Sequence, residues 1–203
     1  MPSSVFIQKM PVSGQSSPEE IFTPAFYQPY CAAVETALQM LCTARRLLCE
    51  DMGEEMVRQM TFRLKTPNSI GDKLKKKRLP VTCDAADAAL HDIAGLRVVL
   101  SSVESVYRYA ALLTASPLAE YVSSRDYIAH PKKSGYRSLH LLMMVPVISR
   151  GQHIMTPVEI QLRTSVMDAW AVVEHDACYK PGAKSDTYSP HLAMLPMPSW
   201  QMA

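Results

Sequence analysis

Apolar and polar residues alternate with the period of a β-strand in the segment VEIQLR (residues 158–163). Its apolar side chains, Val158, Ile160 and Leu162, share one face of the predicted strand. Three polar side chains share the other face: Glu159, Gln161 and Arg163. A polar face is costly to bury unless polar groups lie against it, so the pattern predicts a strand with a core face and a binding face.

Comparable patterns predict strands and helices in alternation along the chain. Strands are expected at residues 57–65, 95–100, 121–128 and 139–147. Helices are expected at residues 30–52, from Pro67 through the following lysines, at 84–90, at 103–113 and from about residue 164. This interleaved order places the fold in the α/β class, with one mixed sheet flanked by helices.

The chain divides into three parts by composition. Residues 1–29 are rich in Ser, Pro and Gln and predict a flexible lead-in. Residues 30–180 contain the periodic segments and are expected to form one domain, because a chain of 203 residues suits a single domain. Residues 181–203 are broken by prolines and predict an irregular tail.

Composition and charge narrow the function classes. The net charge is only +2, so any attraction to polyanions must come from local clusters. Five cysteines without paired spacing favour reduced thiols over a disulfide framework or a zinc site. Because the sequence has neither a signal peptide nor an apolar run long enough to span a bilayer, we expect a cytoplasmic protein that does not bind membranes.

Two acidic residues are the first candidates for a functional role. Asp92 lies just before a predicted strand, and Glu159 lies within one. Magnesium prefers oxygen ligands and commonly bridges one or two carboxylates to substrate phosphates, so the pair predicts a Mg²⁺ site. An equally good explanation is structural, in which Asp92 caps a turn and Glu159 forms an ion pair with Arg97 or Arg163.

Basic residues gather upstream of Asp92. Arg63 and Lys65 point to the same side of the predicted strand, which suits two contacts to one phosphate chain. A basic run follows between Lys73 and Arg78, and most such runs are solvated helix faces. The sequence has no Walker loop and no G-x-G-x-x-G loop, so side-chain charge would have to hold any phosphates.

An aromatic and a histidine follow a Pro-Lys-Lys-Ser-Gly turn. Tyr136 and His140 are four residues apart at the start of a strand and therefore point the same way. A tyrosine beside Lys132 and Lys133 suits the stacking of a base, with the lysines near its phosphates. The alternative is a tyrosine that covers the sheet edge and a histidine that bonds a carbonyl group.

The helix from about residue 164 offers two further residues of interest. Asp168 follows Ser165 at the spacing of a capping box, so a helix cap explains it at least as well as a ligand does. Trp170 falls on the apolar stripe of the same helix, and we expect it in the core.

Four motifs, in this order, resemble the synthetase domain of the RelA/SpoT family: HDIAGLRVVL, DYIAHPKKSGYRSLH, VEIQLRT and MDAWAVVEHDACYK. The resemblance runs from about Arg63 to Lys180. It implies a nucleotidyltransferase-like sheet and a small synthetase of alarmones. These enzymes transfer pyrophosphate from ATP to the 3′-hydroxyl of GDP or GTP and release AMP.

The resemblance also implies roles for individual residues. Asp92 and Glu159 match the Mg²⁺ ligands, and Glu159 also matches the residue that helps to deprotonate the attacking hydroxyl. The positions that match the ATP site are Arg63, Lys65, Lys73 and Arg97. The positions that match the GDP or GTP site are Tyr136, which stacks on guanine, and Lys133, His140, Gln161, Arg163 and Asp168.

The resemblance leaves assembly and acceptor open. Small synthetases usually continue past the tryptophan helix into helices that help to build a tetramer, whereas here a proline-broken tail follows, so a homo-oligomer is not implied. Some toxin-like relatives transfer pyrophosphate to the 3′ end of tRNA, and the basic run would attract RNA as it would any polyanion. A third alternative is an inactive regulator that binds nucleotide or RNA, although such a module would not need both acids.

Overall fold

A computed structural model describes residues 16–178 and 187–188 of the chain. Its centre is a six-stranded sheet in the spatial order β3-β4-β5-β2-β1-β6. The strands are β1 (Val57–Lys65), β2 (Ala94–Leu100), β3 (Glu120–Asp126), β4 (Leu139–Ser149), β5 (Gln152–Thr164) and β6 (Thr187–Tyr188). Only β2 and β5 pair in parallel, and the other neighbours are antiparallel, so the predicted mixed sheet is confirmed.

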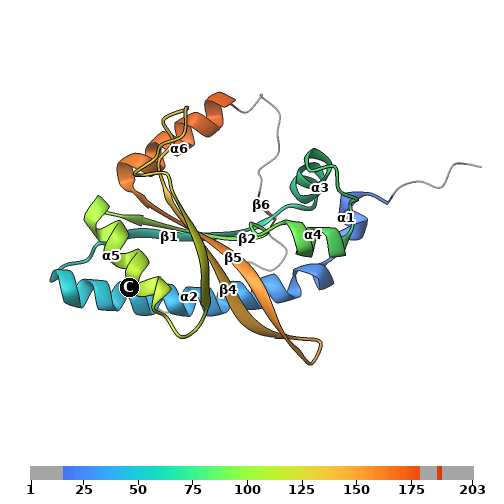
Figure 1. Cartoon of the computed structure of the whole chain (residues 1–203), viewed down its shortest axis with the longest axis horizontal. Helices are drawn as coiled ribbons and strands as arrows, with labels where there is room; N and C mark the ends of the chain where they lie inside the picture. Colours follow the sequence, from blue (N-terminus) through green and yellow to red (C-terminus); the bar gives the residue numbers. More distant parts are fainter. Residues whose placement is uncertain (1–15, 179–186, 189–203) are drawn as a thin grey trace, which may run out of the picture.

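Helices cover the sheet unequally. They are α1 (Pro18–Ile21), α2 (Pro24–Met52), α3 (Pro67–Lys76), α4 (Cys83–Ala89), α5 (Val103–Thr114) and α6 (Ser165–Cys178). Figure 1 shows α2 and α5 lying along one face of the sheet, while α6 and the α3–α4 pair stand at opposite ends of the other face. Within the described residues, no helix covers the middle of that second face, which we call the open face.

The main core lies between α2 and the sheet. The stripe predicted on this helix is confirmed, since Ala37, Leu41 and Leu48 are all buried. From the sheet, Ile160 and Leu162 meet it without exposed surface, as period-two geometry requires. Burial of such side chains provides the dominant favourable term in folding.

The predicted flexible lead-in is wrong for the part of it that the structure describes. Ser17 and Glu20 form a capping box at the start of α1, and Pro24 occupies the first turn of α2. Proline fits the first turn because its missing N–H would have no helical partner there. Phe26 and Tyr27 are then buried, so the helix begins six residues before the predicted Tyr30. Residues 1–15 lie outside the described chain.

Two expectations near the end of the chain are also corrected. Thr187–Tyr188 pairs with β1 as β6, within the segment predicted to be irregular; the rest of that tail lies outside the described residues. Trp170 is 50% exposed and is not a core residue. The reason is that α6 stands at the edge of the open face, where a Cβ atom at Gly135 would lie 3.5 Å from the Trp170 ring, and where Met167 is the residue of α6 that packs against the core among its described side chains.

Within the described residues, none of the helices combines the length and the apolar character that crossing a bilayer would require.

Candidate active site

The two candidate acids meet at the parallel pair of strands. Asp92 precedes β2, and Glu159 lies on β5 directly opposite Gly95 of β2. Arg63 of β1 is opposite Gly95 on its other side, so the missing side chain of Gly95 leaves space between Arg63 and Glu159. A Cβ atom at Gly95 would lie 3.7 Å from Cγ of Arg63. The prediction that neighbouring strands bring the acids together is confirmed.

Two cavities of about 240 Å³ each adjoin these acids. One is lined from β1, β2 and β5, notably by Arg63, Arg97 and Gln161. The other is lined from α3, β3 and β4, notably by Lys73, Lys77, His91, Arg125 and His140. Asp92 and Glu159 are the residues that the two linings share. The acids therefore form the boundary between two compartments.

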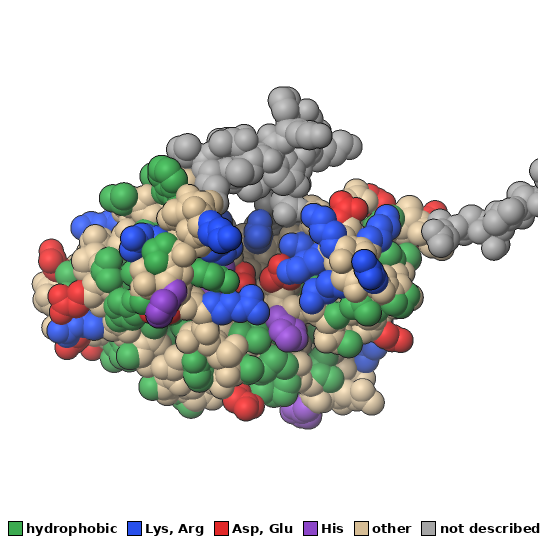
Figure 2. All heavy atoms as spheres, turned by 45° about the horizontal axis from the view of Figure 1, so that its top comes forward, with side chains coloured by type: hydrophobic (Ala, Val, Ile, Leu, Met, Phe, Trp, Pro, Cys, Tyr) green, Lys and Arg blue, Asp and Glu red, His purple; other side chains and the backbone are tan. Residues whose placement is uncertain are grey.

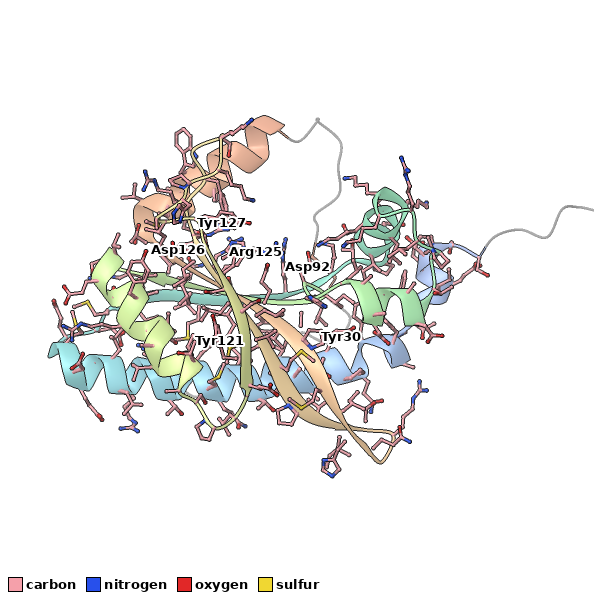
Figure 3. All side chains as sticks on the ribbon, viewed as in Figure 1. Tyr30, Asp92, Tyr121, Arg125, Asp126 and Tyr127 are labelled. Atoms are coloured by element: carbon pink, nitrogen blue, oxygen red, sulfur yellow. The ribbon has the colours of Figure 1, made fainter. Side chains whose placement is uncertain are left out.

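The cavities open on the uncovered face of the sheet. Figure 2 shows this surface hollowed between two groups of Lys and Arg side chains, with acidic side chains inside the hollow. In Figure 3, Asp92 and Arg125 point to the side of the sheet away from α2, and Tyr127 lies beside Arg125. A hollow rimmed by cations with carboxylates at its base is suited to anionic ligands that share a divalent cation.

Asp92 is held by two lysines. Its Oδ2 accepts hydrogen bonds from Nζ of Lys73 at 2.6 Å and from Nζ of Lys65 at 3.3 Å. Burial alone would raise the pKa of Asp92, but the ammonium groups of Lys65 and Lys73 outweigh it and hold the pKa below its usual value. Asp92 is therefore an ionised carboxylate at neutral pH.

Glu159 is held by two donors on its own face of the sheet. Its Oε1 lies 3.2 Å from Nδ1 of His140, and its Oε2 accepts from Nε2 of Gln161 at 2.8 Å. Burial would raise the pKa of Glu159, and the nearby charge of Asp92 adds to this; the interaction with His140 and the Gln161 hydrogen bond outweigh both and lower the pKa. The result is a second ionised carboxylate beside the first.

The sequence left open that Glu159 forms an ion pair with an arginine and that Asp168 caps a helix, and the structure shows neither. Glu159 makes no ion pair with Arg97 or Arg163 in the described chain; both arginines instead contact Oδ1 of Asp168, at 3.4 and 3.2 Å. Asp168 is no helix cap either, because the hydroxyl of Thr164 accepts from the Met167 N–H at the start of α6. Asp168 thus anchors α6 to two cations of the open face.

Tyr136 and His140 lie together, as their spacing predicts. The Tyr136 hydroxyl is 2.8 Å from Nε2 of His140. The Tyr136 ring is only 8% exposed, because Nζ of Lys132 lies 4.5 Å from its centroid and the guanidinium of Arg163 lies 5.0 Å away. A base can stack on this ring only after the Lys132 ammonium has left it.

Lysine 132, not its neighbour, is the residue tied to the aromatic pair. Nζ of Lys132 also lies 4.8 Å from the ring centroid of Tyr127, whereas Lys133 is exposed and contacts no described residue through a hydrogen bond or ion pair. The sequence reasoning singled out Lys133 for the acceptor site. Alternation from Tyr136 could not decide between the two, because they lie in an irregular loop rather than on a strand.

The remaining basic residues separate into two groups. Arg63, Lys65, Lys73 and Arg97, the residues expected at an ATP site, all border the acids or the cavities. In the run from Lys73 to Arg78, the side chains other than Lys73 are exposed or core residues, and of them only Lys77 lines one of the two cavities beside the acids. Sequence reasoning missed Arg125 and His91, which carry no signal beyond their places, within β3 and next to Asp92.

The residues present fit a hard divalent cation. Oδ1 of Asp92 is buried and accepts no hydrogen bond from any described residue. A cation would satisfy this oxygen. No cluster of three or more His, Cys, Asp or Glu that could hold a metal exists in the described residues, so protein ligands alone would not complete the coordination. Magnesium keeps several waters and takes substrate phosphates as ligands, and two carboxylates suit it.

Similarity to known proteins shows the family to which this chain belongs. The sequence profile described as "Region found in RelA / SpoT proteins" matches residues 62–184, more than half of the chain. The chain belongs to the RelA/SpoT family. This RelA/SpoT protein is 36% identical over 157 residues to GTP pyrophosphokinase YjbM of Bacillus subtilis, covering 76% of the chain and 72% of the relative. It is 36% identical over 128 residues to GTP pyrophosphokinase YwaC of the same organism, covering 63% and 61%.

Solved structures of RelA/SpoT proteins have the same fold. Small alarmone synthetase 1 from Bacillus subtilis, bound to its product pppGpp, superposes with a TM-score of 0.70 at 33% identity, covering 83% of each chain. The same synthetase bound to AMPCPP gives a TM-score of 0.62 at 30% identity, covering 74% and 75%. The nucleotidyltransferase-like α/β sheet expected from the resemblance is thereby confirmed.

Proposed function

We propose that this RelA/SpoT chain is a pyrophosphokinase that makes guanosine tetra- or pentaphosphate. The 3′-hydroxyl oxygen of GDP or GTP bonds to the β-phosphorus of ATP, and the bond between that phosphorus and the α,β-bridging oxygen breaks. AMP leaves with the bridging oxygen, and the hydroxyl proton goes to the enzyme. The named relatives carry out this class of reaction, although the chain spans only 61% of YwaC.

The observation that carries the proposal is the pair of cavities that share two acids. A transfer between two nucleotides needs both of them in place at once, with the reacting oxygens in line. We assign the cavity lined by Arg63 and Arg97 to ATP and the cavity lined by His140 and Arg125 to the acceptor. The reacting groups then meet at the shared acids, Asp92 and Glu159.

The lysines and the acids have different roles at the boundary between the two cavities. Lys65 and Lys73 lie on Asp92 and neutralise the charge that spreads over the transferred phosphoryl oxygens. Asp92 and Glu159 would hold Mg²⁺, which would supply positive charge to stabilise the negative charge that develops on the phosphates. Glu159, ionised by its surroundings, accepts the proton of the 3′-hydroxyl as general base.

The acceptor base is held on the opposite side of Glu159 from ATP. Guanine stacks on Tyr136 after Lys132 has moved off the ring, and the displaced ammonium remains near enough for the acceptor phosphates. Arg163 and Asp168 support this side through their hydrogen bond, and Gln161, which lines the ATP cavity, joins the two sides because it accepts from Arg163 and donates to Glu159. A cytoplasmic location, where ATP and GTP are supplied, is part of the same proposal.

One assay tests the activity directly. Purified protein is incubated with γ-labelled ATP, Mg²⁺ and either GDP, GTP, GMP or deacylated tRNA, and the labelled products are separated. We expect label on GDP or GTP. Glu159→Gln should lower the rate by about 100-fold or more, the usual contribution of a general base. Glu120→Gln, which changes an exposed acid on β3, is the matched control and should leave the rate unchanged.

The other outcomes favour the alternatives. Label on tRNA alone would replace the guanosine acceptor with an RNA acceptor, and no transfer to any acceptor would leave a binding protein without this activity. An equal rate for Glu159→Gln and Glu120→Gln would contradict the role given to Glu159. Oligomeric state is measured separately by light scattering, since nothing in the described fold decides it.

A further inference from the structure

Arg163 is a buried cation from which two chains of hydrogen bonds begin. It is 4% exposed, and each of its three guanidinium nitrogens donates a hydrogen bond. Nη1 bonds Asp168, and Nε bonds the Ser138 hydroxyl. Nη2 bonds two groups at once, the Tyr136 hydroxyl at 2.6 Å and Oε1 of Gln161 at 2.8 Å. Because a guanidinium only donates, every one of these partners must accept from it.

The first chain of hydrogen bonds runs from Nη2 through Tyr136 and His140. The Tyr136 oxygen accepts from Arg163, so its own proton is available to Nε2 of His140 at 2.8 Å. In a neutral imidazole one nitrogen accepts and the other donates. Because the carboxylate of Glu159 only accepts, the hydrogen of the neutral ring lies on Nδ1, which faces Oε1 of Glu159 at 3.2 Å, and Nε2 accepts from the Tyr136 hydroxyl.

The second chain runs from the same nitrogen through Gln161. The amide oxygen of Gln161 accepts from Arg163, which turns the amide nitrogen toward Glu159. That nitrogen donates to Oε2 of Glu159 at 2.8 Å. The two chains begin at one nitrogen of Arg163 and end on the two oxygens of one carboxylate.

We propose that Arg163 is a positioning residue that orients Glu159 without touching it, by setting the direction of both hydrogen-bond chains. It fixes the Nδ1–H tautomer of His140 and the orientation of the Gln161 amide. The terminal torsion of a glutamate is broad and costs little to rotate, so two donors are needed to hold its carboxylate in one plane. The catalytic benefit, though not the tautomer, rests on the proposed function.

Tyr136 then has two separable roles. Its ring faces the guanine, and its hydroxyl belongs to the first chain. Tyr136→Phe removes only the hydroxyl, so it cuts the chain and keeps the stacking surface. Tyr127→Phe is the matched control, because the Tyr127 ring packs against both Tyr136 and His140 while its hydroxyl bonds nothing in the described part of the chain.

The first measurement is independent of activity. Protein labelled with ¹⁵N-histidine, free of nucleotide and metal, is studied at pH 8.5, and the His140 signals are assigned by their loss in His140→Gln. We expect the Nδ1–H tautomer in the wild type and in Tyr127→Phe, and a shift toward a mixture of tautomers in Tyr136→Phe. The Nε2–H tautomer in the wild type, or an unchanged tautomer in Tyr136→Phe, would overturn the proposal.

The second measurement is kinetic. Because Arg163 also neutralises Asp168, replacing it endangers the fold, and the variants cut the chains instead. Tyr136→Phe and Gln161→Met should each lower kcat about 3- to 10-fold, the range for one hydrogen bond, with the KM for GDP changed by less than about twofold. A raised KM with unchanged kcat would show binding roles and contradict positioning. Circular dichroism and thermal unfolding verify that each variant is folded.

The two measurements separate this inference from the proposed function. An Nδ1–H tautomer that depends on Tyr136, in a protein that transfers no label to GDP or GTP, would leave the hydrogen-bond chains intact and remove the proposed activity. Labelled product together with the Nε2–H tautomer would support the proposed activity and contradict the hydrogen-bond chains.

Discussion

The two faces of β5 differ in what they need from their surroundings. On the covered face, Ile160 and Leu162 pack under α2 without exposed surface, and any apolar group of the right size would serve. On the open face, Glu159 and Gln161 depend on particular donors at particular atoms. One strand thus carries a stabilising face and a chemical face, and substitutions on the two should affect different observables.

The chemical face is held by polar contacts that span several strands. Arg97, Gln161 and His140 lie directly opposite one another on β2, β5 and β4. Because residues that face each other across strands share a side of the sheet, this row is fixed by the register. A slip of one residue would turn the whole row into the core, so the covered face and its burial also keep the chemical face in place.

The largest effect should come from the covered face. Ile160→Ala should lower the free energy of unfolding by about 2–5 kcal/mol, the range for deleting a buried aliphatic side chain. Gln161→Ala, one residue along, should cost only about 1 kcal/mol, because a hydrogen bond contributes less. Urea unfolding followed by circular dichroism measures both. Equal losses for the two variants would contradict the division between the faces.

A smaller effect is expected for ATP binding. Lys73→Met removes an ammonium that lies on Asp92, and the KM for ATP should rise about 10-fold or more, as for loss of a charge-assisted hydrogen bond of about 1.5–3 kcal/mol. Lys75→Met on the same helix removes an exposed charge and is the control. If Lys75→Met raises the KM as much, the effect is general attraction of anions and not a contact at Asp92.

The pH dependence of stability should come from the open face. Asp92 and Glu159 have lowered pKa values in the folded state, so their contribution is present above the unfolded pKa values of about 4 and is lost as the pH falls through the folded ones. Asp92→Asn should therefore weaken the loss of stability on acidification. Ile160→Ala should keep the wild-type dependence on pH. Unfolding free energies measured between pH 6 and pH 3 compare the three proteins.

The smallest effect concerns the loop before β4. Lys132→Ala should weaken GDP binding about 2- to 5-fold, because its ammonium, once displaced from the Tyr136 ring, is close to the acceptor phosphates, and an exposed ion pair is worth up to about 1 kcal/mol. Lys133→Ala should change it by less than twofold. Isothermal titration with each variant tests this, and the reverse order would restore Lys133 to the acceptor site.

Alternation and helix spacing predicted the strands and helices closely. Both patterns follow from local backbone geometry and are visible in the sequence itself. Residues 57–65 form β1 as predicted, and the polar face of β5 was predicted residue by residue. Proximity of Asp92 and Glu159 was predicted as well, because neighbouring strands of one sheet bring distant residues together.

Other features depend on packing that no local pattern contains. The prolines before Tyr30 indicate loops by composition, yet at Pro24 one of them begins a helix that the aromatic cluster around Phe26 stabilises. Trp170 has helical spacing, yet its partner is the loop glycine Gly135 and not the core. The hydrogen-bond chains from Arg163 could not be predicted, because their direction requires atoms of two strands, β4 and β5, and of the loop before β4.

The parallel pairing of β2 with β5 has a consequence for synthesis of the chain. Asp92 and both lysines that hold it are translated before Glu159, and α5, β3 and β4 lie between them. A nascent chain that ends before β5 therefore holds half of the acid pair and lacks the strand beside β2. The transfer proposed for this chain therefore requires that the ribosome has released enough chain for β5 to insert between β4 and β2.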